Sequence, residues 1–103
     1  MAGPDLLKIV DETHEISKRR GNGKLRREIW VDSDGKVSRF NLAFINRDIH
    51  RGDNGRVLGY DSQHGVWHRH HLGEVSVVVG ASFEEIEAKF EAEIRPYLKG
   101  KRQ

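Results

Sequence analysis

Alternating apolar and polar positions in the middle of the chain predict a series of short β-strands. Residues 25–31 and 37–46 are both rich in apolar side chains, and a turn containing Asp34-Gly35 separates them. An Asp-Gly pair between two such runs is a strong sequence signal for a β-hairpin. The second run carries apolar side chains on both faces, which favours a central position in a sheet. We therefore predict an antiparallel pair whose second strand lies inside the sheet.

Three further strands are predicted downstream, at residues 56–61, 68–72 and 74–79. The turn at residues 53–55 precedes the first of them, and valines recur at every second position of the last. The earlier segment 7–18 is ambiguous, but the glycine-rich turn at residues 21–23 can fold it back against residues 25–31. We expect a strand in this segment as well.

The C-terminal part of the chain predicts a single amphipathic helix. Ser82 and Glu85 have the spacing of a capping box, in which each side chain satisfies a backbone amide of the other residue. Apolar residues then recur at spacings of three and four, at Phe83, Ile86, Phe90, Ile94 and Leu98. Pro96 is expected to end or fray the helix. The predicted fold class is α+β: an antiparallel meander of about five strands with one C-terminal amphipathic helix packed on the sheet.

A chain of 103 residues is long enough for one domain. We expect a single small domain over residues 1–103, with its core at about 24–98 and with residues 1–23 as an N-terminal strand or a flexible lead-in. The chain has no cysteine, which excludes a disulfide framework, a cysteine-zinc site and a thiol nucleophile. No apolar run approaches the ~20 residues that span a bilayer, and the acidic start has no signal-peptide pattern. The sequence thus predicts a cytoplasmic protein with no membrane partner.

Positive charge is concentrated in one stretch, although the formal net charge is only +2. Residues 18–27 contain several lysines and arginines and no acidic residue. Because a basic patch attracts polyanions, five of these side chains are candidate nucleic-acid ligands: Arg19, Arg20, Lys24, Arg26 and Arg27. An ordinary solvated basic surface is the alternative interpretation.

Histidines are clustered late in the chain, where residues 64–71 hold four of the six. On an extended strand, His68 and His70 project from one face, while Arg69 and His71 project from the other. A single histidine would be read as structural, but a cluster of this density indicates a functional site.

Acid–base catalysis is the first interpretation of this cluster. Imidazoles titrate near neutral pH, so His68 and His70 can share the base and acid roles, with Asp61 orienting a ring. Arg69 would bind a phosphate and stabilise developing negative charge. These roles suit cleavage of RNA by its own 2′-hydroxyl, which needs no metal and no other cofactor. Secondary candidates in the same segment are His64, His71 and Tyr60.

Two other interpretations of the histidine cluster stay open. The pattern His68-x-His70 is a ligand geometry for metals such as zinc, and Asp61 can complete a site of the histidine–carboxylate type. The sequence supplies no third well-spaced ligand, so metal-free chemistry is preferred. The cluster can also be a solvated or core-edge patch without a function.

The same segment resembles the TumE-type toxin family of bacterial and archaeal toxin–antitoxin modules. The resemblance rests on a strand carrying Phe44, on Arg-Val-Leu-Gly-Tyr-Asp at residues 56–61, on a short loop with Gly65, and on His-Arg-His at residues 68–70. With the preceding strands and the closing Ser-Phe-Glu-Glu-Ile helix, it covers roughly residues 24–98.

Two departures from the family pattern bear on catalysis. Ser62 stands where the family usually has Asn, and Trp67 stands where it usually has Asp before the His-Arg-His run. If that acid positions a histidine, its loss weakens the catalytic inference. The resemblance implies a small toxin-like protein whose partner is a helix-turn-helix antitoxin. Ribonuclease activity is a hypothesis drawn from the residues themselves.

The sequence therefore predicts a toxin-like component of a toxin–antitoxin module, with metal-independent cleavage of RNA as the hypothesis for its activity. One alternative is a non-enzymatic regulatory module that binds nucleic acid or protein. Another is a small histidine-rich metal-binding protein. A homodimer is also open, because the sequence does not indicate what covers the edges of the predicted sheet.

Overall fold

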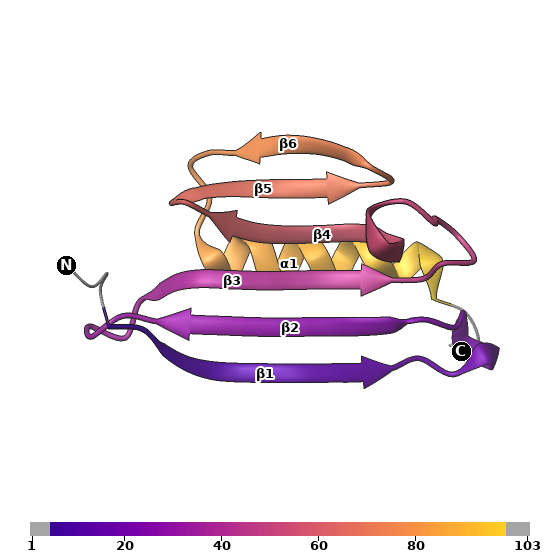
Figure 1. Ribbon diagram of the computed structural model, residues 1–103, viewed down its shortest axis with the longest axis horizontal. Coiled ribbons are helices and arrows are strands. Elements are labelled where there is room, and N and C mark those ends of the chain that lie inside the picture. Colours follow the sequence, from indigo (N-terminus) through magenta and orange to yellow (C-terminus); the bar gives the residue numbers. More distant parts are fainter. Residues whose placement is uncertain (1–4, 99–103) are drawn as a thin grey trace.

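A computed structural model describes residues 5–98 as one antiparallel sheet with a helix across one face (Figure 1). The strands follow one another in chain order, β1-β2-β3-β4-β5-β6. They are β1 (Leu7–Glu15), β2 (Lys24–Val31), β3 (Val37–Ile45), β4 (Arg56–Gln63), β5 (Val66–His71) and β6 (Glu74–Val78). The helices are α1 (Phe83–Ile94) and the short 3-10 turns η1 (Lys18–Arg20), η2 (Asp53–Gly55) and η3 (Arg95–Tyr97). The predicted meander with a C-terminal helix is confirmed, and the ambiguous segment 7–18 supplies the sixth strand, β1.

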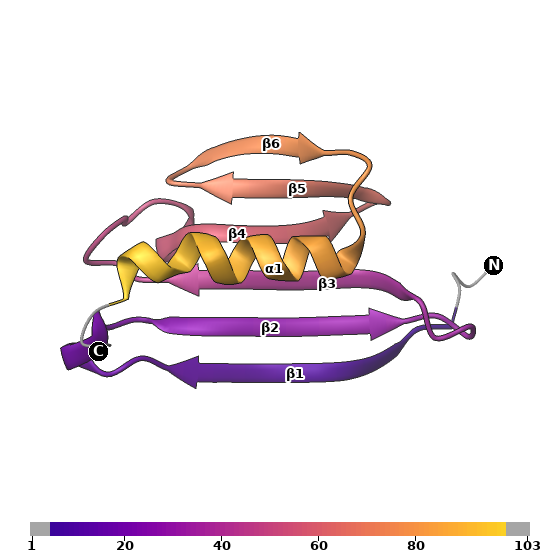
Figure 2. The same cartoon turned by 180° about the vertical axis from the view of Figure 1, so that it is seen from behind.

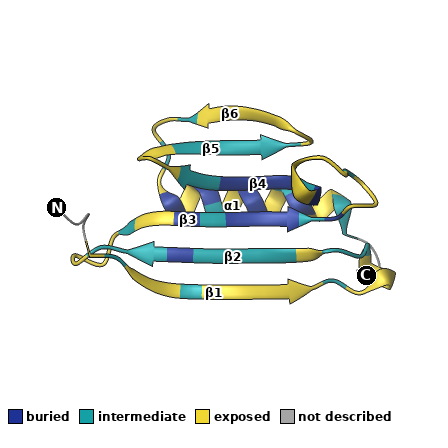
Figure 3. Ribbon diagram, viewed as in Figure 1, coloured by how far each residue is buried: buried dark blue, intermediate teal, exposed yellow. Residues whose placement is uncertain are grey.

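The core lies between α1 and the central strands β3 and β4. Seen from behind, α1 runs along these two strands (Figure 2). The apolar stripe of the helix is buried at Phe83, Ile86, Phe90 and Ile94. It packs on apolar side chains of the sheet, namely Ile29, Phe40, Leu42, Phe44, Leu58 and Tyr60. Burial is accordingly concentrated on β3, β4 and the inner side of α1, while β1 and β6 are largely exposed (Figure 3).

The capping box and the β2–β3 turn that the sequence predicts both form the expected hydrogen bonds. The Ser82 side chain accepts a hydrogen bond from the Glu85 amide at 3.1 Å, and the Glu85 carboxylate accepts one from the Ser82 amide at 2.8 Å. This capping box begins α1, and the helix ends at Ile94, just before Pro96 enters η3. In the β2–β3 turn, the Asp32 carboxylate accepts from two backbone amides further along the turn.

The opposite face of the sheet carries no helix (Figure 1). We call it the uncovered face. Because neighbouring antiparallel strands place paired residues on the same side, the register brings one polar row across it. The row reads Asp11, Glu28, Asn41, Asp61 and His68 from β1 to β5. The sheet therefore aligns carboxylates, an amide and an imidazole that lie far apart in the sequence.

Neither α1 nor the short 3-10 turns within residues 5–98 have the length and apolar character required to cross a bilayer.

Candidate functional site

Asp61 lies at the centre of a polar cluster on the uncovered face. It stands opposite His68 in the β4–β5 register, and Gly59, two residues earlier, stands opposite His70. The missing side chain of Gly59 makes room for Arg56, because a Cβ atom at Gly59 would lie 2.7 Å from the Arg56 Cδ atom. Arg56 therefore lies along the strand and reaches the same carboxylate as the two histidines.

Arg56 and His70 hold the Asp61 carboxylate between them. Arg56 Nη1 donates to Asp61 Oδ2 at 3.2 Å, and His70 Nε2 lies 3.2 Å from Asp61 Oδ1. Arg56 Nη2 lies 3.0 Å from His70 Nδ1. Since a guanidinium can only donate, Nδ1 of His70 is the acceptor and Nε2 carries the proton that points at Asp61. Both ring nitrogens of His70 are thus engaged.

Asp53, in η2, accepts the remaining hydrogen bonds of the Arg56 guanidinium. Arg56 Nε donates to Asp53 Oδ2 at 2.8 Å and Arg56 Nη2 donates to Asp53 Oδ1 at 3.1 Å. These hydrogen bonds hold the pKa of the Asp53 carboxyl below its ordinary value. The guanidinium of Arg56 is consequently neutralised by two carboxylates, and its donors are largely occupied.

His68 differs from His70 because a ring nitrogen of His68 forms no hydrogen bond. Its Nδ1 atom is buried without a hydrogen-bond partner and lies 3.9 Å from Asp61 Oδ1. A buried polar atom without a partner is costly, and a small rotation of the ring brings Nδ1 within reach of Asp61. The two imidazole rings lie 6.3 Å apart between centroids.

An aromatic side chain and a free cation lie on the same face. Arg39 stacks over the Trp30 ring at 4.6 Å from its centroid, with Lys8 Nζ at 4.8 Å. Within residues 5–98, Arg39 forms no ion pair. Trp30 and Arg39 line a shallow pocket of about 350 Å³ that reaches Asp61. Its full lining is Glu28, Trp30, Arg39, Phe40, Asn41, Arg56, Asp61, Ser62 and Gln63.

Arg69 does not join the histidines. Its side chain lies on the face that α1 covers, where Arg69 Nε donates to the Tyr60 hydroxyl at 3.2 Å and Arg69 Nη2 donates to Glu93 Oε2 at 3.3 Å. The Tyr60 hydroxyl donates to Glu93 Oε1 at 2.6 Å. Burial and this contact with Glu93 raise the pKa of Tyr60 to about 12. Arg69 and Tyr60 thus connect α1 to the sheet.

The remaining candidates of the histidine segment are also outside the cluster. His71 Nε2 lies 2.9 Å from the Tyr97 hydroxyl on the covered face. His64 is exposed in the β4–β5 turn. Ser62 and Trp67, the departures from the TumE-type pattern, stand opposite each other, where the Ser62 hydroxyl accepts from the Phe40 amide and the Trp67 ring packs edge-on against Phe40.

The five basic candidates divide into two groups. Arg26 is paired with Asp11 and Glu28, and Arg27 is paired with Glu12 and Glu87. The other three, Arg19, Arg20 and Lys24, are exposed at one end of the sheet.

Arg56 and Arg39 belong to this face although no pattern in the sequence marked them as site residues. Strand alternation places residues 57, 59 and 61 together, so Arg56 would be expected on the opposite side. The β3–β4 register shifts between Phe44 and Ile45, opposite the start of β4. This shift and the space above Gly59 turn the Arg56 side chain to the uncovered face. The sequence signal for this arrangement was a glycine, Gly59, lying between Arg56 and Asp61 in the same strand.

The described residues contain no group of three or more histidine, cysteine, aspartate or glutamate side chains placed to hold a metal ion. Comparison of the chain with protein-family models, with curated proteins and with solved structures finds no match in any of the three.

Proposed function

We propose that this protein binds single-stranded RNA on the uncovered face and cleaves it without a metal, with His68 as the general base. The observation that carries the proposal is the pairing of His68 with Asp61, beside the pocket that Trp30 and Arg39 line. An imidazole backed by a carboxylate is suited to proton transfer near neutral pH.

The proposed reaction needs only the RNA and water. His68 Nε2 takes the proton of a 2′-hydroxyl while the 2′ oxygen forms a bond to the adjacent phosphorus. The bond from phosphorus to the 5′ oxygen of the next nucleotide breaks, and that oxygen takes a proton from water. The hydroxide left behind removes the proton from His68. The products are a 2′,3′-cyclic phosphate and a 5′-hydroxyl.

Other side chains of the face have binding and positioning roles. Asp61 orients His68 once a small rotation of the ring brings Nδ1 from 3.9 Å into hydrogen-bond distance, while His70 and Arg56 hold Asp61 in place. Trp30 offers a surface for stacking a base, as aromatic side chains do in proteins that bind single strands. Arg39 is a cation of this face that forms no ion pair within residues 5–98 and is free to bind a phosphate. In this assignment Arg39 takes the role that the sequence suggested for Arg69.

A second candidate is an RNA-binding module without catalytic activity. The observation that favours it is the saturation of His70 and Arg56, which leaves only one histidine of the cluster with an unused nitrogen. In that case the Asp61 cluster stabilises the sheet, and the protein binds RNA without cleaving it. The two candidates share RNA as the ligand and differ only in the role of His68.

Cleavage of a labelled single-stranded RNA by the wild type and by His68→Ala separates them. If His68 is the base, the substitution lowers the cleavage rate by about 100- to 10,000-fold, with RNA affinity within a few-fold of wild type. His14→Ala is the matched control, since His14 is an exposed histidine on β1. Equal cleavage by wild type and His68→Ala refutes the assignment. RNA that is bound but never cut by the wild type supports the second candidate.

We further propose that the protein acts as the toxin of a toxin–antitoxin module with a helix-turn-helix antitoxin as its partner. Support comes from the resemblance of residues 56–70 to the TumE-type pattern, in which Asp61, His68 and His70 lie together on the uncovered face. Induced expression is expected to arrest growth, with rescue by co-expression of an adjacent helix-turn-helix gene. Unimpaired growth on induction would refute the toxin role.

A further inference from the structure

Two loops dock against each other at one end of the sheet. The β1–β2 loop (residues 16–23) and the β3–β4 loop (residues 46–55) meet at Asn46, the one buried polar residue among residues 5–98. Asn46 Nδ2 donates to the carbonyl oxygens of Gly21 at 2.9 Å and Asn22 at 3.2 Å. The Asn22 side chain in turn donates to Asp48 Oδ2 at 3.0 Å. These bonds hold the two loops as one unit.

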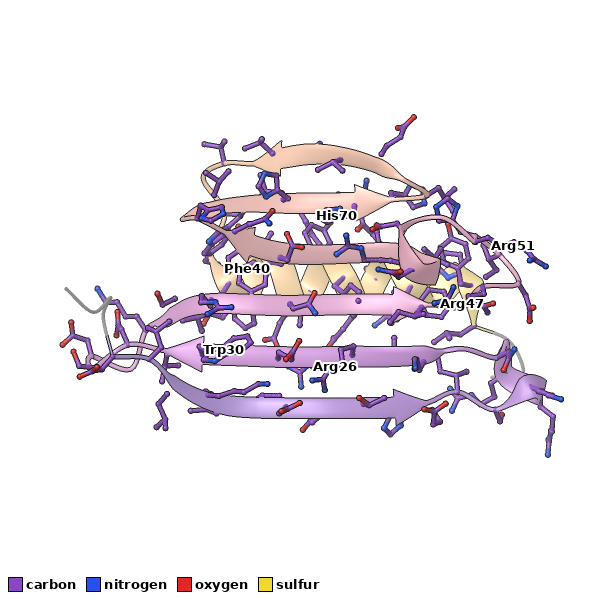
Figure 4. All side chains as sticks on the ribbon, in the orientation of Figure 1. Arg26, Trp30, Phe40, Arg47, Arg51 and His70 are labelled. Atoms are coloured by element: carbon purple, nitrogen blue, oxygen red, sulfur yellow. The ribbon has the colours of Figure 1, made fainter. Side chains whose placement is uncertain are left out.

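The docked loops carry a concentration of unneutralised positive charge. We call this surface the loop platform and define it by Lys18, Arg19, Arg20, Lys24, Arg47 and Arg51. All six side chains are exposed, and none forms an ion pair with another part of residues 5–98. Figure 4 shows Arg47 and Arg51 at this end of the sheet and Trp30 toward the other end.

Nearby carboxylates neutralise little of this charge. Asp48 accepts a hydrogen bond from the neutral Asn22 amide and so offsets only one positive charge of the platform, while Asp53 is paired with Arg56, which lies outside the platform. Glu15 is the remaining acid beside these loops, at the end of β1. The platform therefore keeps a clear excess of positive charge, unlike β2, where Arg26 and Arg27 are both paired with acids.

We propose that the loop platform binds the phosphate backbone of the RNA strand whose bases reach the uncovered face. The β3–β4 loop runs into β4 at one end of the sheet (Figure 1). Arg56 at the start of β4 contacts Asp61, so an RNA strand that leaves the platform along this loop passes η2 and reaches Asp61 and His70. Lysine and arginine contacts to phosphates supply affinity without reading sequence. This inference deepens the proposed function, since it rests on RNA as the ligand.

The chemistry of the platform favours nucleic acid over an anionic membrane. Of the large apolar side chains exposed within residues 5–98, Ile49 is the single one in these two loops. Stable binding to a lipid surface needs a sizeable apolar face or a lipid anchor in addition to positive charge. A phosphate backbone needs only the cations.

The test measures binding of a fluorescent single-stranded 2′-O-methyl RNA, which cannot be cleaved through a 2′-hydroxyl. Failure of the cleavage chemistry therefore leaves this result unaffected. Affinity is determined between about 50 and about 200 mM salt for wild type, Arg19→Gln/Arg20→Gln and Arg47→Gln/Arg51→Gln. The matched control is Lys36→Gln/Lys89→Gln, which removes the same charge from exposed positions outside the platform. Thermal unfolding followed by circular dichroism verifies that each variant is folded.

Each phosphate contact with a single strand contributes about 0.7 to the slope of log affinity against log salt. Each of the two platform double variants is expected to have a slope smaller in magnitude by about 1.4. The ratio of wild-type affinity to variant affinity for RNA is therefore expected to fall about 7-fold over the fourfold rise in salt. The control pair is expected to follow wild type. Equal slopes and affinities for all four proteins overturn the proposal, as does an effect confined to one loop. Loss of binding to anionic phospholipid vesicles with RNA binding unchanged would assign the platform to a membrane instead.

Discussion

Replacement of Tyr60 by phenylalanine tests the connection between α1 and the sheet. The Tyr60 hydroxyl donates to the Glu93 carboxylate at 2.6 Å, a short hydrogen bond to a charged group. Such bonds contribute roughly 1.5–3 kcal/mol to stability. Glu93 keeps its contacts with Arg69 when the hydroxyl is removed. We therefore expect Tyr60→Phe to lower the free energy of unfolding by about 1–2 kcal/mol near neutral pH.

The same contact makes the stability of the wild type depend on pH. The pKa of Tyr60 rises from 10.0 to about 12 in the folded chain, chiefly because of burial and then because of Glu93. Folding therefore favours the protonated phenol, so this stabilisation is fully present below pH 10 and disappears as the pH rises through about 12. Two pKa units correspond to at most about 2.7 kcal/mol. Arg69 and Glu93 are about a third exposed, and screening by solvent reduces the expected loss to about 1–2 kcal/mol.

Urea denaturation of wild type and Tyr60→Phe at a series of alkaline pH values measures this effect. All other ionisable groups are the same in the two proteins, so the difference between the two unfolding free energies isolates Tyr60. That difference is expected to be about 1–2 kcal/mol near neutral pH and to fall towards zero above about pH 12. A difference that stays constant over the alkaline range, or a variant as stable as wild type near neutral pH, refutes the reasoning.

Two further substitutions test the local contacts that shape the fold. Ser82→Ala removes one half of the capping box of α1 and is expected to cost about 1 kcal/mol in urea denaturation; an unchanged transition midpoint would contradict that role. Gly23→Ala places a Cβ atom against the Ile45 carbonyl oxygen at a φ of 96°, and it is expected to cost at least about 2 kcal/mol. Gly35→Ala, at a φ of 81° but with no atom within 4 Å of the added Cβ, is the control and is expected to cost only about 1 kcal/mol; equal losses would exclude the steric contact.

Features that depend on neighbouring residues could be predicted from the sequence. The Asp34-Gly35 turn lies between β2 and β3, and the capping box of Ser82 begins α1. The apolar stripe of the helix is the buried one, because a spacing of three and four residues defines one side of a helix in any context. The placement of His68 and His70 on one face follows equally from strand alternation.

Contacts between side chains that lie far apart in the sequence could not be predicted from local patterns. Alternation already placed Arg69 on the face opposite His68 and His70, but only the packing of α1 decides that this face is covered and that Glu93 binds Arg69. Arg56 reaches Asp61 because a register shift and the space above Gly59 allow it. Arg26 was a candidate RNA ligand, and its neutralisation by Asp11 depends on β1 pairing with β2.

The sequence by itself thus determined the type and order of the elements and the side of each strand on which a histidine lies. These properties follow from turn chemistry, capping and the fixed periods of helix and strand, all of which act over a few residues. The tertiary structure alone decided which charges remain free. The docking of two loops through Asn46 gathers Arg19 and Arg47 on one surface. Pairing register and loop docking join residues far apart in the chain, and no local pattern encodes which cation meets which carboxylate.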